Sequence, residues 1–464
     1  MRLKRLIGIS CLSAAAACSS ENGTSVPAVT RIDSVAVLAN PNMVVSGLVR
    51  YKGAGDSAYV VYRVAGTTAD SMTPRFRHFA GRADTVPALG LLPSTSYEFR
   101  LVVISGTDST VSDPLPLTTG ALPLDLPAYS AGGSSPTPGF YSFGAGQYGL
   151  VIDHTGRVVW YKAFPIGGPG LNFEAQPVGR YVGRYPTPDP TDDDPMMEID
   201  PAGFERRPLR CTNGRRLRFH DVLVAPDSSY WMLCDDTQIE DLTPYHGNPR
   251  AQVTGTVVQH MGRSGSLLFE WTPFTHFLIT DLDSIDRTGS SVNWTHGNAL
   301  EIDTDGNLLV SFRSLSEITK INVTTGDVMW RLGGNRNQFT FAGPAEAGFF
   351  RQHSVRAVAP NTIILLDNSG GASSRFERYG INTTTMTATL QQSYVSSPGV
   401  ATLVGGSVQA EGPNKYLVSF GTEGRVEEFD GNGTMLWHIL GNPGYVFRCL
   451  RIESLYHPVP VVTR

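Results

Sequence analysis

The segment Ile321-Asn-Val-Thr-Thr-Gly-Asp-Val-Met-Trp330 has the pattern of a strand, a polar turn and a second strand that ends in tryptophan. The same pattern recurs along the chain, with copies over residues 152–160, 199–203, 259–271, 321–330, 379–390 and 429–437. Because self-similar units of this spacing are typical of propellers, six copies of a four-stranded unit predict a six-bladed β-propeller. We expect the recurring tryptophan to pack between blades and to be structural.

A second repeated unit lies upstream of the first in most copies. It begins Phe219-His-Asp-Val, Thr295-His-Gly-Asn, Gln352-His-Ser-Val and Gly406-Ser-Val-Gln, and each copy continues as a predicted hairpin. The first strand of a propeller blade lines the central channel. Residues at the start of this unit are therefore expected around one mouth of that channel.

Three consecutive copies of this second unit place a histidine at the same point. These histidines are His220, His296 and His353, and the next copy has Ser407 there. A lone histidine is more often a structural residue, and we assign that reading to the other histidines of the chain. Three histidines in register instead predict a functional cluster on the channel axis.

The residues around the predicted cluster favour an anion over a metal ion. Three neutral imidazoles are able to bind Zn²⁺ or Mn²⁺. The copy with His296 also supplies Asn298, and Arg313 at the end of its second predicted strand. A guanidinium repels a metal ion but binds an oxyanion with two hydrogen bonds. Asp221 is expected to orient a histidine from behind and not to act as a ligand.

Composition supports a chain of strands and turns. The 464 residues include 49 Gly and 31 Pro, and only 17% are charged, against about 25% in typical proteins. The formal net charge of −5 leaves no basic field for a polyphosphate backbone. Nucleic acid is therefore not an expected partner.

The N-terminus is predicted to be an export signal. Residues 1–18 combine a basic start, a short apolar stretch and Ala15-Ala16-Ala17-Cys18. This end resembles a bacterial lipoprotein signal, which predicts lipidation of Cys18; an ordinary cleavage site is the alternative. The expected location is periplasmic or at the cell surface, with any membrane contact through the lipid anchor. In an oxidising compartment Cys211 and Cys234 are able to pair, although the sequence does not fix this.

Residues 19–29 are a polar linker, and residues 30–120 are predicted to form a separate β-sandwich of about seven short strands. The segment Leu91-Leu-Pro-Ser-Thr-Ser-Tyr97 resembles the fibronectin type III signature, in which a tyrosine hydroxyl locks a corner of the sandwich. We expect this module to act as a spacer or docking domain. A proline-rich break follows it, and residues 130–464 form the predicted propeller.

The hairpin motifs resemble the bacterial arylsulfate sulfotransferase family, which uses no nucleotide sulfate donor. The resemblance rests on Trp294-Thr-His-Gly-Asn298 with Ser311-Phe-Arg313, on Phe350-Arg-Gln-His353-Ser354, and on Trp330-Arg-Leu-Gly-Gly334. It implies transfer of a sulfuryl group between phenols through a covalent sulfohistidine, with no cofactor. His353 matches the family nucleophile, and His220, His296, Asn298 and Arg313 match its other channel residues.

The resemblance leaves two assignments open. The family has a substrate-binding threonine near the final blade, for which Ser407 and Thr402 are weak matches. His220 and His296 are both candidates for the general acid and base, with Arg313 holding the sulfuryl oxygens and contributing to catalysis. The implied partners are a small aryl sulfate donor and a phenolic acceptor.

Two functions of other classes compete with sulfuryl transfer. A metal-dependent propeller lyase or hydrolase would use the histidines as ligands. A non-catalytic surface propeller would bind partners without reacting with an aryl sulfate. Incubation with p-nitrophenyl sulfate and a phenol distinguishes the three.

Overall fold

The computed structural model describes residues 29–78, 81–165, 167–169, 172–188, 193–441 and 445–461. The predicted signal peptide over residues 1–18, with the lipidation site Cys18, lies outside the described residues, as does nearly all of the 19–29 linker. The regular elements of the described chain are strands and short 3₁₀ helices, which confirms the all-β prediction. None of its helices has the length and apolar character needed to cross a membrane.

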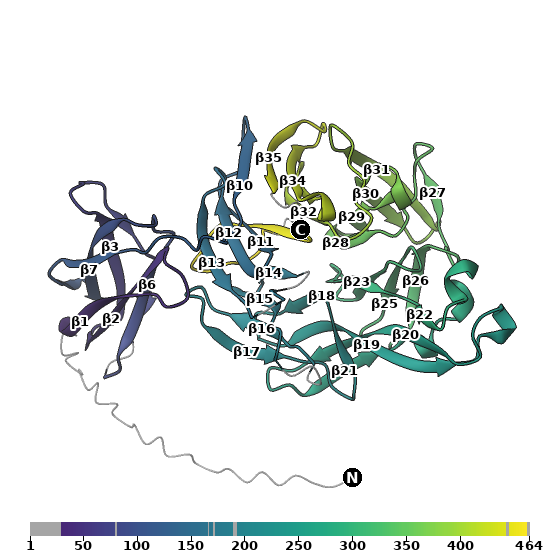
Figure 1. Ribbon diagram of the computed structural model, residues 1–464, viewed down its shortest axis with the longest axis horizontal. Helices are drawn as coiled ribbons and strands as arrows, with labels where there is room; N and C mark the ends of the chain where they lie inside the picture. The colour runs from purple at the N-terminus through teal and green to yellow at the C-terminus, as the bar shows by residue number, and fades with distance from the viewer. Residues whose placement is uncertain are drawn as a thin grey trace, which may run out of the picture.

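An N-terminal sandwich precedes the main body of the protein (Figure 1). One of its sheets contains β1 (Arg31–Ala39), β2 (Ser46–Ala54) and β6 (Asp84–Leu89). The other contains β3 (Ser57–Val64), β4 (Ser71–Met72), β5 (Phe76–Arg77), β7 (Ser96–Ser105), β8 (Asp108–Val111) and β9 (Leu115–Thr118). The backbone N–H of Leu92 donates to the Tyr97 hydroxyl at 2.8 Å, so this tyrosine closes the corner before β7.

Six further sheets of four or five strands follow in the described residues, and Figure 1 shows them arranged around a common axis. Their strands are β10 (Tyr129–Gly133), β11 (Phe140–Ala145), β12 (Tyr148–Asp153), β13 (Val158–Ala163), β14 (Phe173–Gln176), β15 (Arg180–Arg184), β16 (Met196–Ile199), β17 (Glu205–Leu209), β18 (Arg216–Val224), β19 (Tyr230–Glu240), β20 (Ala251–Met261), β21 (Leu267–Trp271), β22 (Ser291–Asn293), β23 (Gly297–Ile302), β24 (Leu308–Phe312), β25 (Glu317–Ile321), β26 (Val328–Gly333), β27 (Thr340–Ala342), β28 (His353–Ala359), β29 (Thr362–Asp367), β30 (Arg375–Asn382), β31 (Thr387–Val395), β32 (Ser407–Gly412), β33 (Lys415–Ser419), β34 (Arg425–Asp430), β35 (Met435–Gly441) and β36 (Cys449–Ile452).

The ends of the chain close the ring of sheets. The late strand β36 pairs with β11 and becomes the inner edge of the sheet that contains β11, β12 and β13. The early strand β10 pairs with β35 at the outer edge of the last sheet. Both pairings join segments from opposite ends of the sequence, so they fix the ring and cover strand edges.

The inner strands of neighbouring sheets contact one another around the axis. Contacts link β18 with β23, β23 with β28, β28 with β32, β32 with β36, and β36 with β14. In four of these strands, β18, β23, β28 and β32, the second repeated unit begins within the strand or directly before it. The structure therefore brings the starts of these units to one end of the axis.

The recurring tryptophans pack between sheets, as predicted. Trp160 on β13 lies against Phe173 and Tyr181 of the next sheet, with ring centroids 5.6 and 4.5 Å apart. Trp437 stacks on Tyr141 with centroids 4.0 Å apart. Burial of such rings makes a large apolar contribution to each sheet interface.

The sandwich shares a core with the first sheets of the main body. Met43 and Leu89 of the sandwich belong to the same buried cluster as Trp160 and Leu455. The N–H of Leu89 also donates to the Tyr456 hydroxyl at 3.1 Å. The sandwich is therefore packed against the main body and is not only tethered to it.

Candidate active site

His353 is the first residue of β28 and is buried, with 2% of its surface exposed. Its Nδ1 lies 2.7 Å from Oδ1 of Asn368. Its Nε2 accepts a hydrogen bond from the N–H of Gly405 at 3.3 Å. The imidazole is thus held at both nitrogens, with Nε2 acting as the acceptor.

The three histidines predicted from the repeat meet at one place. The rings of His220 and His296 are perpendicular, with centroids 5.0 Å apart. The Phe447 ring contacts two of the three histidines: its centroid lies 5.8 Å from that of His220 and 6.2 Å from that of His353. The expectation that these distant residues converge is confirmed.

Arg313 directly follows β24, the second strand of the hairpin that begins after His296, as predicted. Its backbone N–H donates to the carbonyl of His296 at 3.0 Å, which ties the two residues together. Its Nη2 donates to the carbonyl of Leu403 at 3.2 Å, whereas its buried Nε has no hydrogen-bond partner among the described residues. Burial and the nearby Arg351 lower the pKa of the Arg313 guanidinium, so a bound anion would relieve an unfavourable charge.

Asn298 is completely buried beside the cluster. One amide hydrogen on Nδ2 is donated to the Gln352 carbonyl at 2.7 Å, and Oδ1 has no partner within the described chain. The prediction placed His296 and Asn298 on one face of a strand. Instead His296 precedes β23 and has φ +50°, so a strained turn and not strand alternation presents its ring.

Arg448 is the main charged residue that sequence reasoning missed. It precedes β36, is 1% exposed, and pairs with Glu174 and Asp221 at 3.0 and 2.5 Å. These two carboxylates raise its pKa further, and its Nε is buried without a described partner. A permanent cation therefore lies on the axis behind the histidines.

The prediction that Asp221 orients a histidine is wrong. Its carboxylate binds Arg448 through Oδ1, and through Oδ2 it accepts from Arg356 at 3.3 Å and from the Leu300 N–H at 2.9 Å. No described histidine contacts it. Because β18 has an irregular register between Leu217 and Val222, simple alternation did not predict where this side chain points.

Burial and nearby cations keep the three imidazoles neutral. Burial lowers the pKa of His353 to about 3, with Arg313 and Arg448 adding to the effect. Burial and nearby arginines also lower the pKa of His296, to about 2. Burial, together with His296, lowers the pKa of His220 well below its ordinary value. Neutral imidazole is the form that has a lone pair for attack on an electrophile.

The loop over residues 402–405 lies against His353. Gly405 and Gly406 have φ of +75° and +105°, and a Cβ at Gly406 would come within 2.1 Å of Leu366. Glycine is therefore needed for the close approach. Thr402 is buried and directs its hydroxyl to the Val404 carbonyl, so it supports this loop.

Ser407 does not join the histidines through any hydrogen bond of the described chain. Its hydroxyl donates to the Cys449 carbonyl at 3.3 Å and accepts from the Cys449 N–H at 3.1 Å. Both interactions join β32 to β36. The structure thus gives Ser407 a role between strands, and its contact with substrate stays a prediction.

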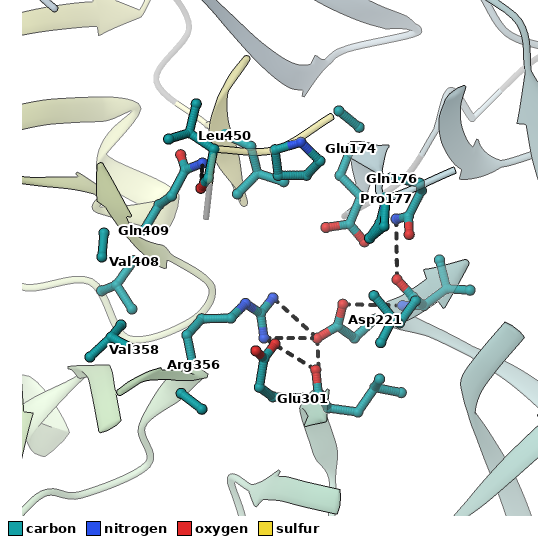
Figure 2. A pocket seen from close by; sticks show the side chains of 18 residues that line it. Glu174, Gln176, Pro177, Asp221, Glu301, Arg356, Val358, Val408, Gln409 and Leu450 are labelled. Carbon is teal, nitrogen blue, oxygen red and sulfur yellow. Dashed lines mark hydrogen bonds and ion pairs between the residues drawn. The ribbon is translucent and has the colours of Figure 1, made fainter. Parts of the chain in front are cut away.

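A cavity of about 110 Å³ lies toward the other end of the channel (Figure 2). Its lining comes from later positions on the same inner strands, and it includes Arg356 and Asp221, which Figure 2 shows paired with one another. Val408 and Leu450 give it apolar walls. It is distinct from the histidine cluster, and the chemistry described above belongs to the cluster.

Two residues of the site, Asn368 and Arg448, were not indicated by any repeat in the sequence. Arg448 occurs in a segment without a matching copy. Asn368 follows β29 directly, as Arg313 follows β24, but the two residues differ in type, so periodicity did not mark it. The sequence signal available for Arg448 was its position, next to Phe447 and directly before the closing strand.

Within the described ranges, no group of three or more His, Cys, Asp or Glu side chains has an arrangement that could hold a metal ion.

Comparisons with solved structures find similar folds at low sequence identity. A protein of unknown function from Bacteroides caccae is 14% identical, with a TM-score of 0.43, over 68% of this chain and 100% of that chain. A catalytically inactive virginiamycin B lyase from Staphylococcus aureus with quinupristin is 9% identical, with a TM-score of 0.37, over 67% of this chain and 88% of that chain.

Sequence comparison gives a more specific result. No curated protein matches the chain. Residues 212–442, about half of the chain, match the family model described as arylsulfotransferase (ASST). The matched segment contains His220, His296, His353, Asn298 and Arg313. The chain belongs to the arylsulfotransferase family.

Proposed function

We propose that the protein transfers a sulfuryl group from a phenolic sulfate ester to a phenolic acceptor, with His353 as the nucleophile in a ping-pong cycle. The observation that carries this proposal is the environment of His353. Its buried, neutral imidazole has an acceptor Nε2, and Arg313 lies close enough to lower its pKa. A lone pair beside a fixed cation suits attack on an anionic electrophile.

In the first half-reaction, Nε2 of His353 attacks the sulfur of the donor. An N–S bond forms, the bond from sulfur to the aryl oxygen breaks, and the aryl oxygen keeps the bonding pair. His220 or His296 provides a proton or a hydrogen bond to that oxygen. The products are a sulfohistidine and the first phenol, which takes its proton from water when the histidine gives only a hydrogen bond.

In the second half-reaction, the oxygen of the acceptor phenol attacks the same sulfur. The N–S bond breaks, its electron pair returns to Nε2 of His353, and the phenol proton passes to a neutral histidine. The new sulfate ester then leaves. The cycle needs no cofactor, because the sulfuryl group is conserved between two esters.

Electrostatics supports this assignment of roles. Sulfuryl transfer resembles phosphoryl transfer, in which charge in a loose transition state resides on three equatorial oxygens. The unpartnered Nε of Arg313 and the second amide hydrogen of Asn298 are available to such oxygens. An anionic donor would also raise the pKa values of the nearby histidines, which favours their taking up a proton during the cycle.

The surroundings of the site support aromatic substrates. Leu403 and Val404, in the loop that contacts Arg313 and His353, are 55% and 43% exposed. Exposed apolar side chains beside a cationic site suit a molecule with an aryl ring and a sulfate group. We therefore propose that this loop contacts the ring of the donor or acceptor.

We also propose that the protein is exported and works in a periplasmic or cell-surface location, anchored through Cys18. The disulfide between Cys211 and Cys234 supports an oxidising compartment, whereas the buried Cys449 is unpaired. Labelling with a radioactive fatty acid in the bacterial host tests the anchor. Loss of the label in Cys18→Ala supports it, and an unlabelled wild-type protein contradicts it.

The activity test uses p-nitrophenyl sulfate with and without phenol. We expect release of nitrophenolate that depends on the acceptor, together with formation of phenyl sulfate. Release of free sulfate at the same rate without phenol would instead indicate a hydrolase. No reaction of the wild-type protein with any aryl sulfate would contradict the proposed function.

A further inference from the structure

We infer that two asparagines, Asn368 and Asn293, hold His353 and His296 in opposite tautomers. His353 then presents a lone pair at Nε2, and His296 presents an N–H at Nε2. This inference rests on the proposed function and deepens it, because it separates the roles of histidines that the sequence treats alike. Asn368 and Asn293 act as positioning residues.

The hydrogen bonds of Asn368 fix the orientation of its amide. Its Nδ2 donates to the carbonyls of Thr402 and Gly405, at 2.8 and 3.1 Å. Two carbonyl oxygens require an NH₂ group on that side, so the oxygen faces His353. Since Oδ1 accepts only, the Nδ1 of His353 at 2.7 Å must carry the proton.

The second nitrogen of His353 gives the same answer independently. Nε2 accepts from the N–H of Gly405, so Nε2 has the lone pair. An imidazole that is neutral carries one proton, and here both contacts place it on Nδ1. Asn368 is 1% exposed, and its partners come from the loop that covers the site. The loop and the nucleophile are thus positioned by one side chain.

Asn293 produces the reverse arrangement at His296. Its Oδ1 accepts from Nη2 of Arg218 at 3.3 Å, and Arg218 is held by Asp235. The NH₂ group of Asn293 therefore faces Nδ1 of His296, at 2.6 Å. Because this NH₂ group donates, Nδ1 of His296 accepts, and the proton of the neutral ring lies on Nε2. No described residue forms a hydrogen bond with that Nε2.

The two tautomers suit different tasks in the transfer. Nε2 of His353 gives up its hydrogen bond from the Gly405 N–H and forms the N–S bond, while the ring proton stays on Nδ1, shared with Asn368. His296 donates a hydrogen bond from Nε2 to the aryl oxygen as that oxygen takes the electron pair of the breaking bond. Asn293 occupies Nδ1, which disfavours a second proton, so His296 acts as a neutral donor and keeps its proton.

Proton transfer then falls to His220. Its Nδ1 is buried and has no hydrogen-bond partner in the described chain. In the second half-reaction the phenol proton passes to this nitrogen as the acceptor oxygen bonds to sulfur, and it then leaves to water, which restores the neutral ring. The geometry thus assigns nucleophile, neutral hydrogen-bond donor and proton carrier to three separate histidines.

Paired variants of Asn368 test the first half of the inference. Asn368→Asp keeps an acceptor for the Nδ1 proton, whereas Asn368→Leu removes it. In a mass-spectrometric time course with p-nitrophenyl sulfate alone, we expect Asn368→Leu to slow adduct formation about 100-fold or more, since a wrong tautomer can cost up to about 10⁴ in kcat. Both variants lose the two hydrogen bonds to the loop carbonyls, so Asn368→Asp should be slower than the wild type but at least about tenfold faster than Asn368→Leu. Equal losses in both variants would overturn the role.

The leaving group tests the second half. Asn293→Ala removes the donor to Nδ1 of His296 and lets its ring adopt either tautomer. We expect kcat with phenyl sulfate, whose leaving group is poor, to fall about tenfold. With p-nitrophenyl sulfate, whose leaving group is good, kcat should change less than twofold. An equal fall for both donors would contradict a role at the aryl oxygen.

A spectroscopic measurement separates this inference from the proposed function. In protein labelled with ¹⁵N-histidine, nitrogen chemical shifts distinguish protonated from unprotonated ring nitrogens, and the variants His353→Gln and His296→Gln assign the signals. We expect protonated Nδ1 in His353 and protonated Nε2 in His296. The same tautomer in both rings would overturn the inference even in an active enzyme, whereas opposite tautomers in a protein inactive toward aryl sulfates would count only against the proposed function.

Discussion

At the scale of single residues, the repeat predicted the histidines but not the residues that control them. His220, His296 and His353 recur at one position of the unit, so periodicity alone indicated that they meet. Arg448 comes from a segment without a matching copy, and Asn368 stands where the preceding copy has Arg313, so neither residue type recurs, and their contacts with the site depend on tertiary packing. Sequence patterns therefore indicated the three histidines. The buried cation Arg448 and the histidine tautomers could be inferred only from the structure.

Arg313 is expected to stabilise the transition state more than the ground state. Loss of one oxyanion donor costs about 3 kcal/mol, so Arg313→Ala should lower kcat about 100-fold or more in the p-nitrophenyl sulfate assay. Arg313→Lys keeps the charge but loses the forked donor and should recover part of the rate. A kcat in Arg313→Ala within threefold of the wild type would contradict this role.

The neutral histidines predict a loss of stability in acid. The pKa of His353 is about 3 in the folded protein and about 6.5 in an unfolded chain, because burial, Arg313 and Arg448 disfavour its charge. Between these values the unfolded chain binds more protons, so the free energy of unfolding decreases as pH falls. From pH 7 to pH 5 the effect is about 2 kcal/mol for one such histidine.

Urea unfolding at pH 7 and pH 5 checks this expectation. His353→Gln removes the titrating group but keeps a polar side chain of similar reach. It should lose about 1–2 kcal/mol less than the wild type between the two pH values. The same loss in both proteins would show that His353 is not held neutral by its surroundings.

At the scale of elements, the hairpins were predictable from the sequence, whereas the strand pairings that close the ring of sheets were not. The two repeated units mark the inner and outer hairpins, because alternating apolar residues and turn residues are local signals. Strand β36 pairs with β11, and β10 pairs with β35. Both pairings join segments that are distant in the sequence, and no local pattern in these strands identifies the partner. The irregular registers of β18 and β23 also changed which side chains face the axis.

A substitution in the loop over residues 402–405 is expected to weaken substrate binding without slowing the chemical step. Leu403→Asp places a charge beside the proposed position of the aryl ring, which should raise KM for aryl sulfates about tenfold while kcat changes little. Leu268→Asp is a matched control, since Leu268 is 58% exposed and lies on β21. Equal KM values for the two variants would mean that the loop does not contact the substrate.

At the scale of the whole molecule, the sandwich and the ring of sheets form one packed unit. The sequence predicted both parts and placed their boundary in a proline-rich break, but it did not predict that they share a core. Leu89 and Leu455, from opposite ends of the chain, lie in one buried cluster. Several of the contact residues, such as Met43 and Leu455, lie in loops, which carry no periodic signal.

Tyr456 is the residue through which this packing is best tested. Its hydroxyl accepts from Leu89, and its ring lies 6.1 Å from that of Phe76. Tyr456→Ala should reduce the free energy of unfolding by about 3 kcal/mol. Calorimetry should show one transition in the wild type and two in the variant, whereas Tyr245→Ala, at an exposed site, should behave as the wild type does. Two transitions already in the wild type would contradict a shared core.

The claim at the centre of this account is that a neutral His353 accepts the sulfuryl group. The most direct measurement is peptide mass spectrometry of protein quenched after incubation with p-nitrophenyl sulfate and no acceptor. We predict a sulfuryl mass increment on the peptide that contains His353, its disappearance on addition of phenol, and its absence in His353→Gln. Transfer to phenol that persists in His353→Gln, or an adduct on another residue, would contradict the account.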